Sequence, residues 1–350
     1  MQEKDIIWID WARFLGIFLV ILGHCLQIPK NFLQNFLVEI WHWIYLFHMP
    51  LFFIISGYLF KQQERMDWIK LFRGLIIPYF LYQFIFIPIM LLSHLSHGQG
   101  LVDTFLKLIL GILMGDGYDT QYSYTVCLPA WFIISIIQLR LLFLKIIINN
   151  VSTIILSFAS IVFLIFQKQL GFDLFCCLDS TIMAIPYFLL GYIMKNKLDL
   201  NDDLSNKTQL RYRLVVGGGK IVASIICMIM TIIILGINGP TQMNGPSCGK
   251  SVLLNYVAGI SGTMIIFLLS SYGSSRSFVK LISRNTLFLI FYHWIMIIFI
   301  NQVGFRSLLD DVCNPFVQLA IIIVLVALSL LSANYVIKFL QRKYPIILGK

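Results

Sequence analysis

The sequence predicts an all-α protein: a polytopic membrane bundle of about ten transmembrane helices with both termini in the cytoplasm. Of its 350 residues, 59% are hydrophobic and only 12% are charged, and ordinary soluble domains carry roughly twice that charged fraction. Apolar runs of about 17 or more residues recur along the chain. Lipid admits only helices and closed barrels, and these runs are too long for barrel strands.

Ten helical spans are predicted from these apolar runs. They cover residues 10–28, 37–60, 74–93, 127–147, 151–167, 180–195, 219–237, 251–271, 286–303 and 315–338. The first run lacks a short apolar core followed by a small-residue cleavage site, so we interpret it as a retained helix and not a signal peptide. Residues 1–350 therefore read as a single integral membrane domain.

The distribution of basic residues predicts the orientation. With the N-terminus in the cytoplasm, five of the 26 lysines and arginines lie outside, and the other 21 lie at inner ends, loops and tails. The five are Lys30, Lys107, Lys168, Lys250 and Arg306. Cytoplasmic segments of membrane proteins are enriched in Lys and Arg, so this asymmetry favours an even number of spans with both ends inside.

The same rule accounts for the net charge of +10, so no nucleic-acid partner is expected, and the lipid bilayer is the expected surroundings. Seven cysteines are present without a CxxC pair or a zinc pattern, and no metal site is predicted. Cys176, Cys177, Cys248 and Cys313 fall in or near predicted outer loops, where disulfides form in an oxidising compartment. Spacing assigns no pairing among them.

The first span places Arg13 and His24 eleven residues apart with no ionisable residue between them. Eleven residues make about three helical turns, so the two side chains point roughly the same way and lie about 16 Å apart along the axis. Ionisable groups within a membrane are costly, and by default they mark function. A snorkelling arginine and an interhelically bonded histidine are the alternative.

The second span carries Glu39, His42, His48 and Ser56. The helical repeat places His42 and Ser56 on one face, while His48 points elsewhere unless Pro50 bends the helix. Glu39 lies one turn outward from His42 and is placed to orient an imidazole. Interhelical hydrogen bonding by the histidines is an equally good interpretation.

Further candidates lie before the third span and inside the ninth. Lys70 and Arg73 lie one turn apart at the predicted cytoplasmic rim, where they suit phosphate binding or ordinary membrane anchoring. His293 is predicted near the middle of the ninth span. Within the longest outer connection, residues 115–124 are rich in aromatic, hydroxyl and acidic side chains, which suit either carbohydrate or a membrane interface.

Five motifs occur in one order: Trp8–Asp10 with Arg13 and His24, Phe47–Phe60, Lys70–Arg73 through Pro78–Phe80, Pro129–Phe132, and Asn285–Thr286 through His293. In these motifs the chain resembles the acyltransferase-3 family of integral membrane O-acyltransferases, and within it the fucose 4-O-acetylase-like branch. The resemblance spans most of the chain, and residues 94–126 and 195–215 carry little of it.

The resemblance implies transfer of an acyl group, usually acetyl from cytoplasmic acetyl-CoA, to a hydroxyl of a cell-surface polysaccharide or its lipid-linked precursor, in the bacterial inner membrane. It implies functional roles for Arg13 and His24, and it maps the family's basic pair onto Lys70 and Arg73. The first member of that pair is often arginine in the family, and here it is lysine.

The resulting hypothesis is that Arg13, Lys70 and Arg73 bind the phosphates of coenzyme A, and that His24 meets the thioester about 16 Å further along the helix. An imidazole with an ordinary pKa near 6.5 suits a general base at neutral pH. Glu39 and His42 are candidate orienters of this catalytic group, and His48, Ser56 and His293 are candidate pore-lining residues, the last two as oxyanion donors.

Three alternatives stay open at this point. His24 accepts the acyl group itself in an acyl-histidine mechanism. The chain is a transporter or flippase for a glycan or small sugar, with histidines that relay protons or line the path. In the third alternative, the chain is a non-catalytic membrane partner in glycan assembly.

Overall fold

The computed structural model of the protein describes residues 6–30, 36–62, 67–115, 117–195, 209–245, 247–302, 304–312 and 314–350. Nearly all of this part of the chain is helical, and its β-type pairing is limited to an isolated bridge between Gln242 and Ser247. The predicted all-α fold is confirmed.

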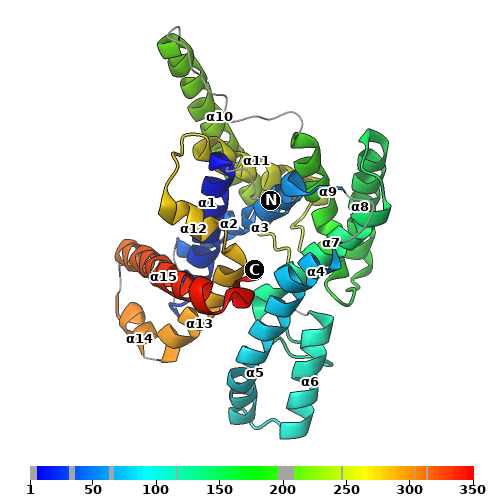
Figure 1. The fold of residues 1–350 in the computed structure, drawn as a ribbon, viewed down its shortest axis with the longest axis vertical. Coiled ribbons are helices and arrows are strands. Elements are labelled where there is room, and N and C mark those ends of the chain that lie inside the picture. Colours follow the sequence, from blue (N-terminus) through cyan, green and yellow to red (C-terminus); the bar gives the residue numbers. More distant parts are fainter. Residues whose placement is uncertain are drawn as a thin grey trace.

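The helices are joined mostly by short connections (Figure 1). In chain order they are α1 (Ile7–Cys25), α2 (Leu37–Tyr45), α3 (His48–Leu59), α4 (Trp68–Leu71), the π-helical turn η2 (Phe72–Ile76), α5 (Ile77–Ser96), α6 (Leu101–Met114), η3 (Leu128–Ala130), α7 (Trp131–Lys145), α8 (Asn150–Leu170), α9 (Leu178–Met194), α10 (Gln209–Asn238), α11 (Val252–Ser270), α12 (Ser277–Ser283), α13 (Thr286–Gln302), α14 (Phe305–Asp310), α15 (Pro315–Lys343) and η4 (Pro345–Leu348).

Each of the ten predicted spans coincides with one of these helices or with a broken pair of them. Eight of the described helical stretches are long and apolar enough to cross a membrane, and α12 with α13, bent by 84°, gives up to nine. Helix α9 is apolar but shorter. The protein is therefore a multi-pass membrane protein, while the number of crossings and the side of each terminus stay predictions. We call the two ends of the bundle inner and outer after the predicted orientation.

Helix α1 lies in the middle of the bundle and packs against α2, α3, α11, α12, α13 and α15 (Figure 1). Two glycines permit close packing on α1. A Cβ at Gly16 would lie 2.9 Å from side-chain atoms of Leu51 and Phe52, and one at Gly23 would lie 3.1 Å from the ring of Tyr45. Small residues allow membrane helices to approach closely. Gly23 therefore brings α2 next to His24, its neighbour in sequence.

The second predicted span is divided between Tyr45 and His48. Pro50 has no amide hydrogen, and α3 begins two residues before it. Phe47 lies at the break with φ −139° and ψ −12°, outside the helical region. The bend that the sequence left conditional on Pro50 is thus present as a break, and it changes which side chains of this span face the first helix.

Helix α3 packs closely against α9. A Cβ at Gly57 would lie 1.9 Å from the carbonyl oxygen of Phe188, and one at Gly191 would lie 1.9 Å from that of Ile54. Backbone therefore lies directly against backbone, as in other small-residue contacts between membrane helices. This contact fixes the position of α3 and the residues at its start.

Candidate active site

A cavity of about 370 Å³ lies within the outer half of the bundle. Its volume falls in the range of small-molecule sites. The walls come from the end of α1 and the turn after it, from α2 and α3, from residues 128–132, from the turn 242–244, and from α13 with α14. Most of these segments lie toward the predicted outer end of their helices, and Ile290 on α13 extends the wall toward the inner end.

His24 lines this cavity from α1. Its Nδ1 lies 3.4 Å from the hydroxyl oxygen of Tyr45, a long hydrogen bond, and Gln27 donates from Nε2 to the same oxygen at 3.1 Å. The imidazole lies 5.2 Å from the ring of His293 and 5.6 Å from that of Trp294, measured between centroids. Side chains from α1, α2 and α13 therefore hold His24 in place.

His48 and His293, the two histidines near His24, have tautomers that their hydrogen bonds define. Nδ1 of His48 lies 3.0 Å from the carbonyl oxygen of Ile44, and Nδ1 of His293 lies 2.8 Å from that of Leu289. A carbonyl oxygen only accepts, so Nδ1 carries the hydrogen in each case. In a neutral ring Nε2 is then an acceptor. The predicted role of His293 as an oxyanion donor would require its imidazolium form.

The structure brings only part of the predicted pore lining to the cavity. His48 lines it, together with its neighbour Met49. His293 is fully buried behind the ring of His24 and does not form part of the wall, and Nε2 of His293 has no hydrogen-bond partner among the described residues. Ser56 is half-buried further along α3 and also lies outside the lining. The division of the second span explains this selection, because it turns His48 toward α1.

Glu39 and His42 do not lie at the cavity. Glu39 is exposed, and the half-buried ring of His42 lies against Trp41 with 4.8 Å between centroids. The two side chains are near enough for their charges to interact, as their spacing predicts. The partner that the structure gives to His24 from this segment is Tyr45, three residues further on. The orienting role of Glu39 and His42 stays a prediction, and Tyr45 joins them as a candidate for it.

The predicted phosphate-binding residues lie away from the cavity, toward the inner end. Arg13 is half-buried on α1, and its positive charge interacts with that of Arg140 on α7. Lys70 and Arg73 are exposed, Lys70 at the end of α4 and Arg73 in the π-helical turn that follows. Asp67 caps this segment by accepting a hydrogen bond from the Lys70 amide at 3.0 Å.

Sequence reasoning missed three residues of these surroundings. Arg140 carries a signal that could have found it, since a charge inside a predicted span is by default functional. Tyr45 and Arg306 carried no such signal. The role of Tyr45 depends on the division between α2 and α3, and Arg306 reaches the cavity from a six-residue helix that follows α13.

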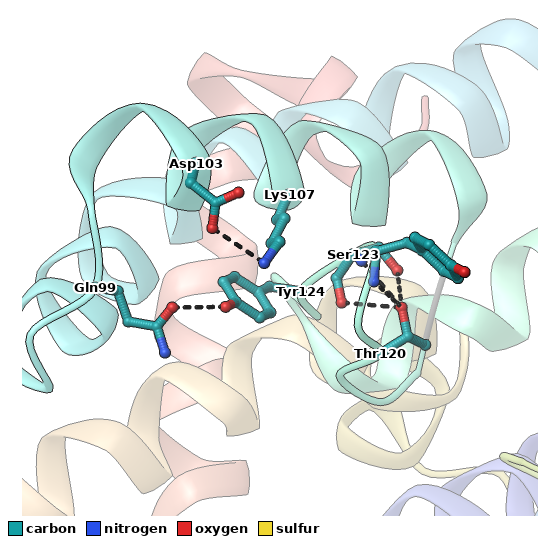
Figure 2. A network of polar contacts seen from close by, with 7 residues as sticks. Gln99, Asp103, Lys107, Thr120, Ser123 and Tyr124 are labelled. Carbon is teal, nitrogen blue, oxygen red and sulfur yellow. Dashed lines mark hydrogen bonds and ion pairs between the residues drawn. The ribbon is translucent and has the colours of Figure 1, made fainter.

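The outer connection between α5 and η3 is held by polar contacts (Figure 2). Tyr124 donates to Oε1 of Gln99 at 2.7 Å, and Nζ of Lys107 lies 5.1 Å above the Tyr124 ring. Lys107 also pairs with Asp103 at 3.0 Å, and this hydrogen bond raises the pKa of Lys107. Tyr124 thus belongs to the packing of α6, whereas Tyr122 is 71% exposed.

This connection also supports the cavity. Nδ2 of Asn244, a lining residue, donates to the carbonyl oxygen of Gly117 at 2.8 Å. Ser180 donates to the carbonyl oxygen of Met243 at 2.6 Å from the other side. The turn that carries Met243 and Asn244 is therefore held between the outer connection and α9.

None of the described cysteines lines the cavity. Cys248 is a free thiol, and burial raises its pKa to about 11. Cys177 donates from Sγ to the carbonyl oxygen of Gly115 at 2.8 Å, and Cys176 donates to Sδ of Met114 at 3.6 Å. Cys313 lies outside the described residues. Within the described ranges, no group of three or more His, Cys, Asp or Glu is arranged to hold a metal ion.

These features define a class: a multi-pass membrane protein with a cavity of histidines, amides and aromatic rings toward one end of its bundle. The family model for an acyltransferase domain, of acyltransferase-3 type, matches residues 6–334. The chain therefore belongs to the acyltransferase-3 family and is a membrane-bound acyltransferase. Neither the curated proteins nor the solved structures contained a match to the chain.

Proposed function

We propose that this acyltransferase transfers acetyl from cytoplasmic acetyl-CoA to a hydroxyl of a cell-surface polysaccharide or of its lipid-linked precursor, in a bacterial cytoplasmic membrane. The observation that carries the proposal is the placement of His24 in the wall of an outer cavity while Arg13 lies at the inner end of the same helix. The separation of eleven positions along the helix corresponds to about 16 Å. A fucose 4-O-acetylase-like specificity belongs to this proposal.

The donor enters from the inner end, where cations gather. Arg13 and Arg140 interact through like charges, so an anion between them relieves their repulsion. We assign the phosphates of coenzyme A to this pair, with Lys70 and Arg73 at the exposed rim. The pantetheine arm then extends toward His24, so that the thioester meets the acceptor without passage of coenzyme A across the membrane.

At the thioester, His24 acts as the general base. In the catalytic form we assign the hydrogen to Nδ1, which donates it to the Tyr45 oxygen 3.4 Å away, so that Nε2 is unprotonated. Nε2 takes the proton of the acceptor hydroxyl, and the oxygen attacks the carbonyl carbon. The carbon–sulfur bond then breaks, and the departing thiolate receives the proton. The products are the O-acetyl ester and free coenzyme A.

The test is acetyl transfer by the purified full chain in lipid nanodiscs, with radiolabelled acetyl-CoA and a lipid-linked glycan extract. His24→Ala should lower the turnover rate by about 10²- to 10⁴-fold, the usual contribution of a general base. His97→Ala is the matched control, because His97 is exposed in the outer connection. Near-normal turnover by His24→Ala would contradict the proposal.

The same assay distinguishes the other mechanisms. An acyl-histidine intermediate would leave label on the wild-type chain when acetyl-CoA is supplied without acceptor, and our general-base proposal predicts none. A transporter or flippase would move a glycan without any acyl donor. Dependence of glycan labelling on both acetyl-CoA and His24 separates the acetylase from each of these.

A further inference from the structure

The charge of the cavity lining is unbalanced. Among the described residues that line it, Arg306 is the one permanently charged side chain, and none is Asp or Glu. The amides of Gln27, Gln242, Asn244 and Asn301 supply the other polar groups besides the histidines and Tyr45. A neutral sugar needs no cation at the mouth of its site, so the charge of Arg306 calls for a reason.

Arg306 is available to a ligand. Its side chain is exposed, and the structure describes neither an ion pair nor a hydrogen bond for it with any described residue. Asp310 lies four residues further along the same helix and would be its usual partner. Asp310 instead accepts from the Lys30 amide at 2.7 Å and lies 3.8 Å from Lys30 Nζ.

One face of α13 runs along the cavity from beside His24 toward α14, the helix that carries Arg306. Ile290, Trp294, Ile297 and Asn301 line the cavity at helical spacing. Trp294 contacts the ring of His24, and Asn301 lies near the end of α13, just before α14. Asn301 follows Trp294 by seven positions, which corresponds to about 10 Å along the axis. A ligand that contacts both His24 and Arg306 must therefore extend along this face of α13 beyond the sugar hydroxyl that reacts.

We propose that the acceptor is an anionic glycan: its hydroxyl lies at His24, and its carboxylate or phosphate lies at Arg306, beyond the outer end of α13. The inference rests on the proposed function and names its substrate class. A guanidinium binds either oxyanion through charge-assisted hydrogen bonds. Trp41, Trp131 and Trp294 in the wall offer faces for the sugar rings.

Binding can be measured without catalysis, because three tryptophans line the cavity and a bound saccharide changes their fluorescence. The probes are a disaccharide glycoside that ends in glucuronic acid, the same glycoside that ends in glucose, and the glucose form carrying a phosphate. The full chain in nanodiscs should bind at least one acidic probe about tenfold or more tightly than the neutral probe, as expected for a charge-assisted contact. Comparison of the affinities of the glucuronic acid probe and the phosphate probe shows whether the site prefers a carboxylate or a phosphate.

Arg306→Gln should reduce the ratio of acidic to neutral affinity to near one and leave the neutral affinity unchanged. Arg306→Lys should restore part of the ratio. Lys250→Gln is the matched control, since it removes an exposed outer cation that does not line the cavity, and it should keep the wild-type ratio. Equal binding of the three probes by the wild-type chain, or an unchanged ratio in Arg306→Gln, would overturn the inference.

Acetyl transfer to the same probes separates this inference from the proposed function. A wild-type chain that acetylates the neutral probe as well as the acidic ones refutes the anionic acceptor and keeps the acetylase. A chain that binds acidic probes through Arg306 but acetylates none refutes the proposed function, while the anion site at Arg306 stands.

Discussion

His24 and Tyr45 illustrate how single residues define this site. A titratable ring within a membrane helix is expensive, so its position in the sequence already indicated function. No comparable feature of the sequence indicated its partner, Tyr45. Tyr45 is one of 15 tyrosines, and only the close approach of α2 at Gly23 gives it a role beside the imidazole.

At this scale we predict that Tyr45→Phe lowers the turnover number by about two- to tenfold, because one ordinary hydrogen bond to His24 is lost. The KM for acetyl-CoA should not change, since we propose that the donor phosphates bind at the inner end, away from Tyr45. The acid limb of the pH–rate profile should shift, which a purely structural defect would not cause. Steady-state acetyl transfer across a pH series measures all three.

Tyr122→Phe is the control for this substitution, because Tyr122 is exposed in the outer connection. An equal loss in Tyr122→Phe, or an unchanged pH profile in Tyr45→Phe, would remove Tyr45 from the positioning of His24.

Among the elements, the contact of α3 with α9 fixes the half-span that carries His48. At Gly57 and Gly191 the two backbones lie in direct contact, because glycine has no side chain to separate them. Lipid supplies no hydrophobic driving force for helix association, so this close packing holds the two helices together. The sequence contained both glycines within predicted spans, but it did not indicate that the two spans face each other, because only the fold pairs them.

We therefore predict that Gly191→Ala destabilises the protein, although Gly→Ala within a helix usually stabilises it by about 1 kcal/mol. The added Cβ would overlap the carbonyl oxygen of Ile54, and overpacking of this kind costs about 1–3 kcal/mol. The apparent Tm in detergent should fall by several degrees.

Gly236→Ala is the matched control on α10, because nothing lies within 4 Å of the Cβ it would add. This variant should keep the wild-type Tm or exceed it. A Tm of Gly191→Ala equal to that of the control would show that α3 and α9 are not in close contact.

The whole molecule shows why the helices were predictable and the site only partly so. Composition and apolar periodicity predict helices in lipid, because the backbone there has no other partners. His24 was found from its cost in the membrane, and His48 from the same reasoning. Three features depend on contacts between distant segments, which no local pattern encodes: the break before His48, the position of Glu39 and His42 outside the cavity wall, and the arrival of Arg306 from α14.

At the same scale, the excess of basic residues on one side predicts the orientation of the chain. Lys250→Cys should react with a membrane-impermeant maleimide in intact cells. Lys61→Cys should react only after permeabilisation, because Lys61 lies at the predicted inner end. Both positions are exposed, and the wild-type chain measures the background from native cysteines. Reaction of Lys61→Cys in intact cells would invert the predicted orientation.

The cavity is walled by packed helices around His24 and by short connecting segments nearer the predicted outer surface. Around His24 the walls are helices packed on several sides, whereas the mouth includes the turn 242–244 and the short helix α14. Connecting segments tolerate substitution and insertion far better than packed spans do. Selection can therefore alter which acceptors enter by changing these two short stretches alone, while the packed helices around His24 stay the same.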